Sequence, residues 1–165
     1  MVSSNTFKSI WSMFPTGVSL VTTIEPNGSV HGMPANSISS VSIDPLLVLV
    51  CVDHSRDTFK IINTSNRFGI NFLSEDQKYI IDQYLSKDEY GSEERSKQYC
   101  FTEHGSAMLK NCVAMLDCRV VNQYLAGDHT IFVAEVDGAY LNNEINPLIF
   151  FKGEYMKIPD QIIDS

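Results

Sequence analysis

Apolar residues follow two different periods along this chain, and the first period is helical. Ser4 and Asn5 can cap a helix near the start of the chain, and Pro15 followed by Gly17 is a typical stop signal. Between these signals, large apolar residues recur at helical spacing. They predict a short amphipathic helix whose apolar face is formed by Phe7, Ile10, Trp11 and Phe14.

The pattern then changes to short β-branched runs separated by turn residues. Residues 18–24 and 30–36 flank the turn signal at 26–28, so they predict a β-hairpin. After Pro45, the run 46–52 is apolar, short and bounded, which predicts a buried strand.

Helices and strands alternate in the middle of the chain. Ser55 is a good N-cap for the helical pattern that follows it. Residues 67–73 predict a strand, and 74–77 have the spacing of a capping box that starts a helix reaching about Leu85. The polar, acidic segment 86–105 is interpreted as a surface excursion with some helix.

The last third of the chain is β-like, with strands predicted at 113–124, 130–140 and 148–151. A tight connection at 125–129 joins the first two. Six or seven strands with hairpin-like connections and few helices favour a mainly β (α+β) fold over a doubly wound parallel sheet. We expect a six- to seven-stranded antiparallel Greek-key barrel with a few flanking helices, formed by residues 1–165 as one domain.

Composition removes several functional classes. The chain has 165 residues, 44% of them hydrophobic, which is ample for a packed core. Its net charge of −8 argues against nucleic-acid binding, which needs clustered Lys and Arg. The apolar run 46–52 is too short to cross a membrane, and residues 1–5 do not resemble a signal peptide. We therefore expect a soluble, cytoplasmic protein that binds neither nucleic acid nor membrane.

The cysteines indicate neither a metal site nor an oxidising compartment. Cys51, Cys100, Cys112 and Cys118 contain no CxxC pair and no zinc-ligand spacing, so no metal is expected. Cys51 and His54 are close enough in sequence to suggest a thiolate–imidazolium pair. A core cysteine followed by a histidine at the strand end is the favoured interpretation.

Three stretches carry candidate chemistry, although each also has an ordinary structural explanation. Residues 55–58 combine hydroxyls, a guanidinium and a helix N-terminus, which suits a phosphate monoester or simply caps a helix. Residues 32–37, followed by the hydroxyl-rich 39–42, form a small strand end that can accept a flat ring or turn a barrel corner. The turn 126–129 presents His129, which is either functional or an inert surface histidine.

Together, these stretches resemble the flavin reductase-like family, which includes the reductase components of two-component monooxygenases. The similarity extends from residue 7 to residue 155 in family order. Its matching segments are 14–18, 21–23, 32–37, 40–48, 68–77, 126–129 and 147–155. Lys152 stands where the family frequently has an arginine.

The resemblance implies a split β-barrel homodimer with FMN or FAD bound near the subunit interface. His129 would be the catalytic residue beside the nicotinamide of NADH or NADPH. The flavin-binding residues implied by the family match are Pro34, Ala35, Asn36, Ser37, Val41, Ser42, Cys51, Val52, Asp53, His54, Ser55, Arg56 and Thr58. Those implied for the pyridine nucleotide are His129, Phe150, Phe151, Lys152 and Gly153.

The expected function is therefore an NAD(P)H:flavin oxidoreductase that supplies reduced flavin to a partner such as a monooxygenase. Hydride transfer requires orientation of two rings and no general base. Two alternatives stay open from the sequence: an FMN-binding electron-transfer or storage flavoprotein with little NAD(P)H turnover, and a diverged barrel that serves as an interaction module without flavin.

Overall fold

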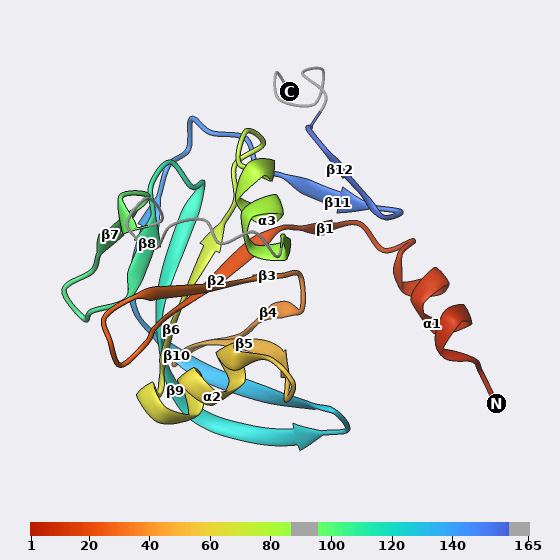
Figure 1. The fold of residues 1–165 in the computed structure, drawn as a ribbon, viewed down its shortest axis with the longest axis horizontal. Helices are drawn as coiled ribbons and strands as arrows, with labels where there is room; N and C mark the ends of the chain where they lie inside the picture. Colours follow the sequence, from red (N-terminus) through yellow and green to blue (C-terminus); the bar gives the residue numbers. More distant parts are fainter. Residues whose placement is uncertain (87–95, 159–165) are drawn as a thin grey trace.

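The computed structural model describes residues 1–86 and 96–158, and a seven-stranded antiparallel sheet forms its centre (Figure 1). From one edge to the other, the sheet contains β3 (Val30–Ala35), β2 (Ser19–Ile24), β6 (Arg67–Phe72), β9 (Ala114–Ala126), β10 (His129–Leu141), β5 (Leu46–Asp53) and β4 (Ile38–Ile43). Every neighbouring pair in this order is antiparallel.

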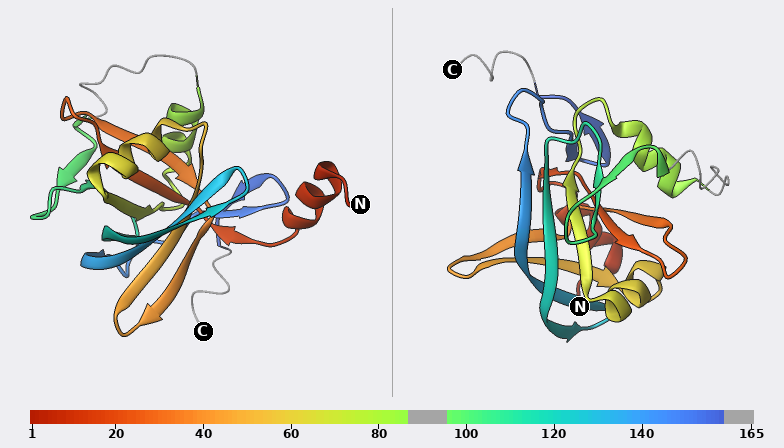
Figure 2. Two further views of the ribbon diagram at one scale, coloured as in Figure 1. Left: turned by 90° about the horizontal axis from the view of Figure 1, so that it is seen from below. Right: turned by 90° about the vertical axis from the view of Figure 1, so that its left-hand side faces the viewer.

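The two edge strands, β3 and β4, follow one another in the chain, so the strongly coiled sheet curls back towards its own start (Figure 2). The β9–β10 ladder is the longest in the sheet and contains irregularities at 133–134 and 136–138, where the strands bend. This arrangement confirms the predicted mainly β, split-barrel class.

Two smaller sheets flank the barrel. Strand β1 (Thr16–Gly17) pairs with β11 (Ile149–Phe151), which also pairs with β12 (Glu154–Met156). Strand β7 (Tyr99–Phe101) pairs with β8 (Ala107–Leu109). The segment 86–105 therefore contributes a strand that the sequence analysis did not predict, while 87–95 lie outside the described residues.

Three helices accompany the strands, and their starts differ from the sequence prediction. Helix α1 (Ser4–Trp11) is capped by the side chain of Ser3, which accepts a hydrogen bond from the Thr6 N–H. Helix α2 (Asp57–Ser65) begins after Arg56, so Ser55 is not its N-cap as predicted. Before α3 (Lys78–Leu85), the Ser74 N–H donates to Gln77 Oε1, half of the predicted capping box.

Two hydrophobic clusters hold the fold together. One lies inside the curved sheet and under α2, and includes Phe68, Phe132 and Ile62, each at most 1% exposed. The other joins the sheet to α3 and to the β7–β8 pair through Leu20, Ile80, Ile81, Leu109 and Met115. In contrast, α1 has no buried residue and extends away from the sheet (Figures 1 and 2).

Two predictions about the β4–β5 region are corrected. Residues 39–42, interpreted as a strand end or barrel corner, form part of strand β4. The strand predicted to be buried, now β5, is buried only on alternate residues, because its other face is left open. Val50 and Val52 occupy the core, whereas Cys51 faces away from it and is not the core residue expected.

A buried carboxylate ties the loop between β7 and β8 to the central sheet. Asp117 is inaccessible to solvent, and it accepts hydrogen bonds from the hydroxyls of Thr102 and Ser106 and from the Arg67 guanidinium. Arg67 also binds Asp137, with 2.9 Å between Nη1 and Oδ2. These donors hold the pKa of Asp117 below its ordinary value although burial opposes the shift.

Within residues 1–86 and 96–158, none of the helices has the length and apolar character needed to cross a membrane.

Candidate functional site

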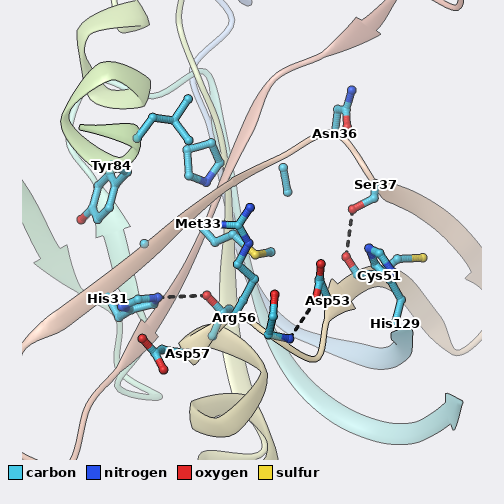
Figure 3. Close-up of a pocket in the computed structure, with 16 residues that line it drawn as sticks. His31, Met33, Asn36, Ser37, Cys51, Asp53, Arg56, Asp57, Tyr84 and His129 are labelled. Carbon is cyan, nitrogen blue, oxygen red and sulfur yellow. Dashed lines mark hydrogen bonds between the residues drawn. The ribbon is translucent and has the colours of Figure 1, made fainter. Parts of the chain in front are cut away.

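A cavity of about 400 Å³ opens where β3, the end of β5, the start of α2 and the end of α3 meet (Figure 3). Its size lies within the range of small-molecule sites. Sixteen residues line it: His31, Gly32, Met33, Pro34, Ala35, Asn36, Ser37, Cys51, Asp53, Ser55, Arg56, Asp57, Thr58, Tyr84, Leu85 and His129.

One wall is the segment that passes from β3 to β4. Its small residues keep the backbone accessible, and hydrogen bonds fix its course. The Cys51 N–H donates to the Ser37 carbonyl at 3.0 Å, and the Ser37 hydroxyl donates back to the Cys51 carbonyl at 2.9 Å. Ser19 donates to the Ala35 carbonyl at 2.6 Å. The wall is thus a rigid surface of the kind that a flat ring can lie against.

The β5–β10 ladder supplies a second group of side chains. Cys51 and Asp53 lie two residues apart on β5 and so share a face, and His129 is the register partner of Asp53. Partial burial raises the pKa of the Cys51 thiol, which keeps the group protonated. The thiolate–imidazolium pair considered for Cys51 and His54 is therefore not supported.

His129 is held by its own turn. Gly127 adopts a left-handed conformation with φ of 66°, and the Nδ1 atom of His129 lies 2.7 Å from Oδ1 of Asp128. This hydrogen bond is the main reason that the pKa of Asp128 is lowered. An ionised Asp128 accepts a hydrogen bond from the Nδ1–H of His129. The Nε2 atom is therefore the ring nitrogen that can contact a ligand.

The opposite end of the cavity is built around the start of α2. Arg56 precedes the helix and makes no side-chain cap, while the Ser55 N–H donates to Oδ1 of Asp53 at 2.7 Å. This bond lowers the pKa of Asp53. Thr58 is only 1% exposed, and its hydroxyl shares a 3.0 Å hydrogen bond with Nε2 of His31. Hydroxyls, a guanidinium and the first N–H groups of a helix therefore converge, as the sequence predicted.

Helix α3 closes the cavity on the side of β3. The hydroxyls of Tyr84 and Tyr99 are 2.6 Å apart, which anchors the Tyr84 ring above Gly32. Leu85 continues this wall and also borders a neighbouring pocket of about 190 Å³ that contains Val18, Phe150 and Tyr155. The two pockets share Leu85 and the segment 34–36.

Most of the predicted site residues meet in the cavity. Ten of the flavin- and nicotinamide-binding predictions line it: Pro34, Ala35, Asn36, Ser37, Cys51, Asp53, Ser55, Arg56, Thr58 and His129. Phe150 lines the neighbouring pocket. Phe151, Lys152 and Gly153 line neither of these two pockets.

Four predicted flavin-binding residues lie elsewhere. The Val52 side chain is fully buried in the core, because it projects to the opposite face of β5 from Cys51. The His54 ring packs against Phe59, and its Nε2 atom lies 3.0 Å from the Thr130 hydroxyl. Val41 and Ser42 are on the edge strand β4, outside the lining of the cavity.

Three lining residues lie outside the stretches that the sequence singled out: His31, Tyr84 and Leu85. His31 could have been predicted, because it directly precedes the small segment at 32–37. Side chains alternate along a strand, so His31 and Met33 lie on the same face of β3. Tyr84 and Leu85 had no such signal, because only the packing of α3 beside β3 brings them to the cavity.

The lining residues include one guanidinium, Arg56, with two carboxylates close to it in the chain, Asp53 and Asp57. Arg56 is the one Lys or Arg side chain among the lining residues. Asp57 is paired with Lys60 at 2.8 Å, and this bond lowers the pKa of Asp57. A ligand with a flat ring near His129 and a phosphate near Arg56 matches this distribution. Among residues 1–86 and 96–158, no group of three or more metal-binding side chains is assembled.

The chain is similar to known flavin reductases. The family model of the flavin reductase like domain matches residues 11–159. A flavin reductase of Pseudomonas putida is 32% identical over 149 residues, covering 90% of this chain and 86% of the relative. The NADH-dependent flavin reductase StyB of Pseudomonas fluorescens is 31% identical, covering 93% and 89%.

A solved structure shows the same similarity at the level of the fold. BorF, the flavin reductase component of a bacterial two-component tryptophan halogenase, superimposes with a TM-score of 0.87 at 29% identity. The match covers 96% of this chain and 99% of BorF.

Proposed function

The chain belongs to the flavin reductase-like family, and we propose that it reduces a flavin with NADH or NADPH and delivers the reduced flavin to a partner enzyme. One observation carries the proposal. A single cavity unites the ring-binding wall at 34–37, the cationic end at Arg56 and the imidazole of His129. Relatives of the chain are named as flavin reductases, which is the same activity.

The cavity residues fit a phosphorylated flavin. Pro34, Ala35 and Met33 offer apolar and backbone surface for the isoalloxazine ring. The Arg56 guanidinium and the α2 N-terminus offer donors for the phosphate, whereas the Ser55 N–H already donates to Asp53. One charge-assisted phosphate site together with a buried ring supports about 8 kcal/mol of binding free energy, which corresponds to micromolar affinity. We propose FMN as the flavin, with FAD as the alternative that the same phosphate contacts admit.

A flavin bound in this cavity would supply its N5 atom as the acceptor of a hydride from C4 of the nicotinamide. The protein's task is to orient the two rings, which saves the entropic cost of bringing them together. His129 suits this task because Asp128 and the Gly127 turn fix its ring. We propose that His129 contacts the nicotinamide ring. The rest of the pyridine nucleotide would then extend towards the adjoining pocket at Phe150.

We further propose a homodimer that acts in the cytoplasm. Large apolar side chains are exposed on α1 and on the β4–β5 hairpin, including Trp11 at 58%, Ile43 at 87% and Leu46 at 53%. Such surfaces are typical of subunit interfaces. The four cysteines are all free thiols, which fits a reducing compartment. The partner that consumes the reduced flavin is proposed to be a monooxygenase or a similar component, such as a halogenase of the kind that BorF serves.

The test uses the purified protein with added FMN. Quenching of FMN fluorescence measures binding, and oxidation of NADH is followed with and without the flavin. We expect micromolar or tighter binding and NADH oxidation that depends on flavin. Binding without turnover would favour an electron-transfer flavoprotein, and the lack of any quenching at saturating protein would rule out the flavin site.

A further inference from the structure

His31 contacts the proposed phosphate site from behind, at the opposite end of the cavity from His129 (Figure 3). Its Nε2 atom lies 3.0 Å from the Thr58 hydroxyl oxygen. Its Nδ1 atom lies 3.7 Å from Oε1 of Glu25, which precedes the β2–β3 turn. The imidazole therefore connects an acidic side chain to a buried hydroxyl at the start of α2.

The direction of the hydrogen bond between His31 and Thr58 determines what the hydroxyl can do. A threonine hydroxyl has one proton to donate and two lone pairs that accept. If Thr58 gave its proton to the imidazole, only lone pairs would face an incoming phosphate oxygen, and they would repel it. If Nε2–H donates to Thr58 instead, the hydroxyl proton is available for the phosphate.

The charges around His31 favour the second arrangement. Glu25 faces Nδ1, and Asp57 interacts electrostatically with the ring from α2. Both carboxylates attract positive charge on the ring. An Nε2–H beside the Nδ1–H that faces Glu25 requires the doubly protonated ring, because a neutral imidazole carries a proton on only one nitrogen. On α2, Lys60 is paired with Asp57 at 2.8 Å, and Arg56 directly precedes the helix. A phosphate bound at Arg56 adds further negative charge on the Thr58 side.

We propose that His31 is a positioning residue for phosphate recognition: its Nε2–H donates to Thr58 and thereby directs the Thr58 hydroxyl proton to the flavin phosphate. The inference rests on the proposed function and adds a specificity element to it. His31 would favour flavins that carry a phosphate over riboflavin, without contacting the isoalloxazine ring.

A double-mutant cycle tests this relationship. The dissociation constants of FMN and riboflavin are measured by fluorescence quenching for the wild type, His31→Ala, Thr58→Val and the double variant. A hydrogen bond to a charged group corresponds to about tenfold or more in affinity. We expect each single variant to bind FMN about tenfold more weakly while riboflavin binding is unchanged. The double variant should be no weaker than Thr58→Val, because His31 acts through that hydroxyl.

Two further variants separate positioning from a structural role. His31→Gln keeps an N–H donor near the Nε2 position and should regain most of the lost FMN affinity. His104→Ala removes an exposed histidine of the β7–β8 loop, outside the cavity, and should change neither affinity. Thermal unfolding of every variant checks that the fold is retained.

Several outcomes would overturn the inference. Equal weakening of FMN and riboflavin by His31→Ala would show a structural role, and additive losses in the cycle would show independent action. A His31→Gln variant as weak as His31→Ala would contradict the donor role. If the wild type fails to bind FMN at all, the proposed function itself fails. If it binds FMN and His31→Ala binds equally well, only the positioning role is refuted.

Discussion

A Cβ atom built on Gly32 would lie 2.6 Å from the Tyr84 ring, much closer than side chains approach one another in folded proteins. Gly32 is buried on β3, and Tyr84 is held in place by the 2.6 Å hydrogen bond between its hydroxyl and that of Tyr99. The missing side chain therefore lets α3 pack tightly against β3. This close approach forms one wall of the candidate flavin cavity.

Gly32→Ala should destabilise the protein and disturb that wall. The added methyl group must displace an anchored ring, so we expect a loss of about 1–3 kcal/mol in the free energy of unfolding. Denaturant unfolding measures it. Gly17→Ala is the matched control, because no atom lies within 4 Å of the added carbon there. Equal stability of the Gly32 and Gly17 variants would contradict the steric argument.

Arg56→Ala should weaken FMN far more than riboflavin, because the guanidinium is placed to bind the phosphate. A lost charge-assisted hydrogen bond predicts at least a tenfold increase in the FMN dissociation constant. Lys60→Ala removes a cation of the helix that Arg56 precedes, at a residue that does not line the cavity, and serves as the control. Similar losses for both flavins would mean that Arg56 merely supports the fold.

His129→Ala should slow the reduction of bound flavin by NADH at least tenfold while FMN affinity changes little. The reason is that misplacing the reacting atoms by about 1 Å costs about a hundredfold in rate. Stopped-flow absorbance measures the reduction directly, with His104→Ala as a control for loss of a histidine. An unaltered rate would remove His129 from the mechanism and favour the electron-transfer alternative.

The protein should be a homodimer in solution, with a mass twice the 18.5 kDa of one chain. Light scattering of the flavin-loaded protein measures this mass. Ile43→Glu, at a side chain that is 87% exposed on β4, should raise the monomer fraction because it places a charge on the proposed interface. A monomeric mass for the flavin-loaded wild type would refute the dimer.

Asp117→Asn should reduce stability at neutral pH by about 1–3 kcal/mol, because a buried ionised acceptor loses its charge-assisted bonds. The pKa of Asp117 is lowered in the folded state from its ordinary value of 3.8. The ionised Asp117 therefore contributes its full stabilisation at pH values above 3.8. This stabilisation is lost as the pH falls through the pKa of Asp117 in the folded state. Unfolding measured from pH 7 downwards should show the wild type and the variant converging below about pH 4. A constant difference across this range would exclude the charge as the cause.

Much of the architecture follows from local pattern alone. The hairpin of β2 and β3, strands β6, β9, β10 and β11, and all three helices agree with the predicted elements to within a few residues. Turn residues and the two-residue period identify these strands without any knowledge of their neighbours. Strand β4 was missed because its central residues are three serines and one valine, whose hydroxyls are equally typical of a turn.

The sequence by itself determined the chemistry of the candidate site: a hydroxyl-rich helix start with Arg56, a small strand end at 34–37 and His129 after a tight turn. These signals are local, because each occupies a few consecutive residues. Only the tertiary structure decided that Val52 turns into the core while Cys51 faces the cavity, and that Tyr84 lies over Gly32. It also joined His31 to Thr58, 27 residues further along the chain. Such contacts depend on strand register and helix packing between distant segments, which no local pattern encodes.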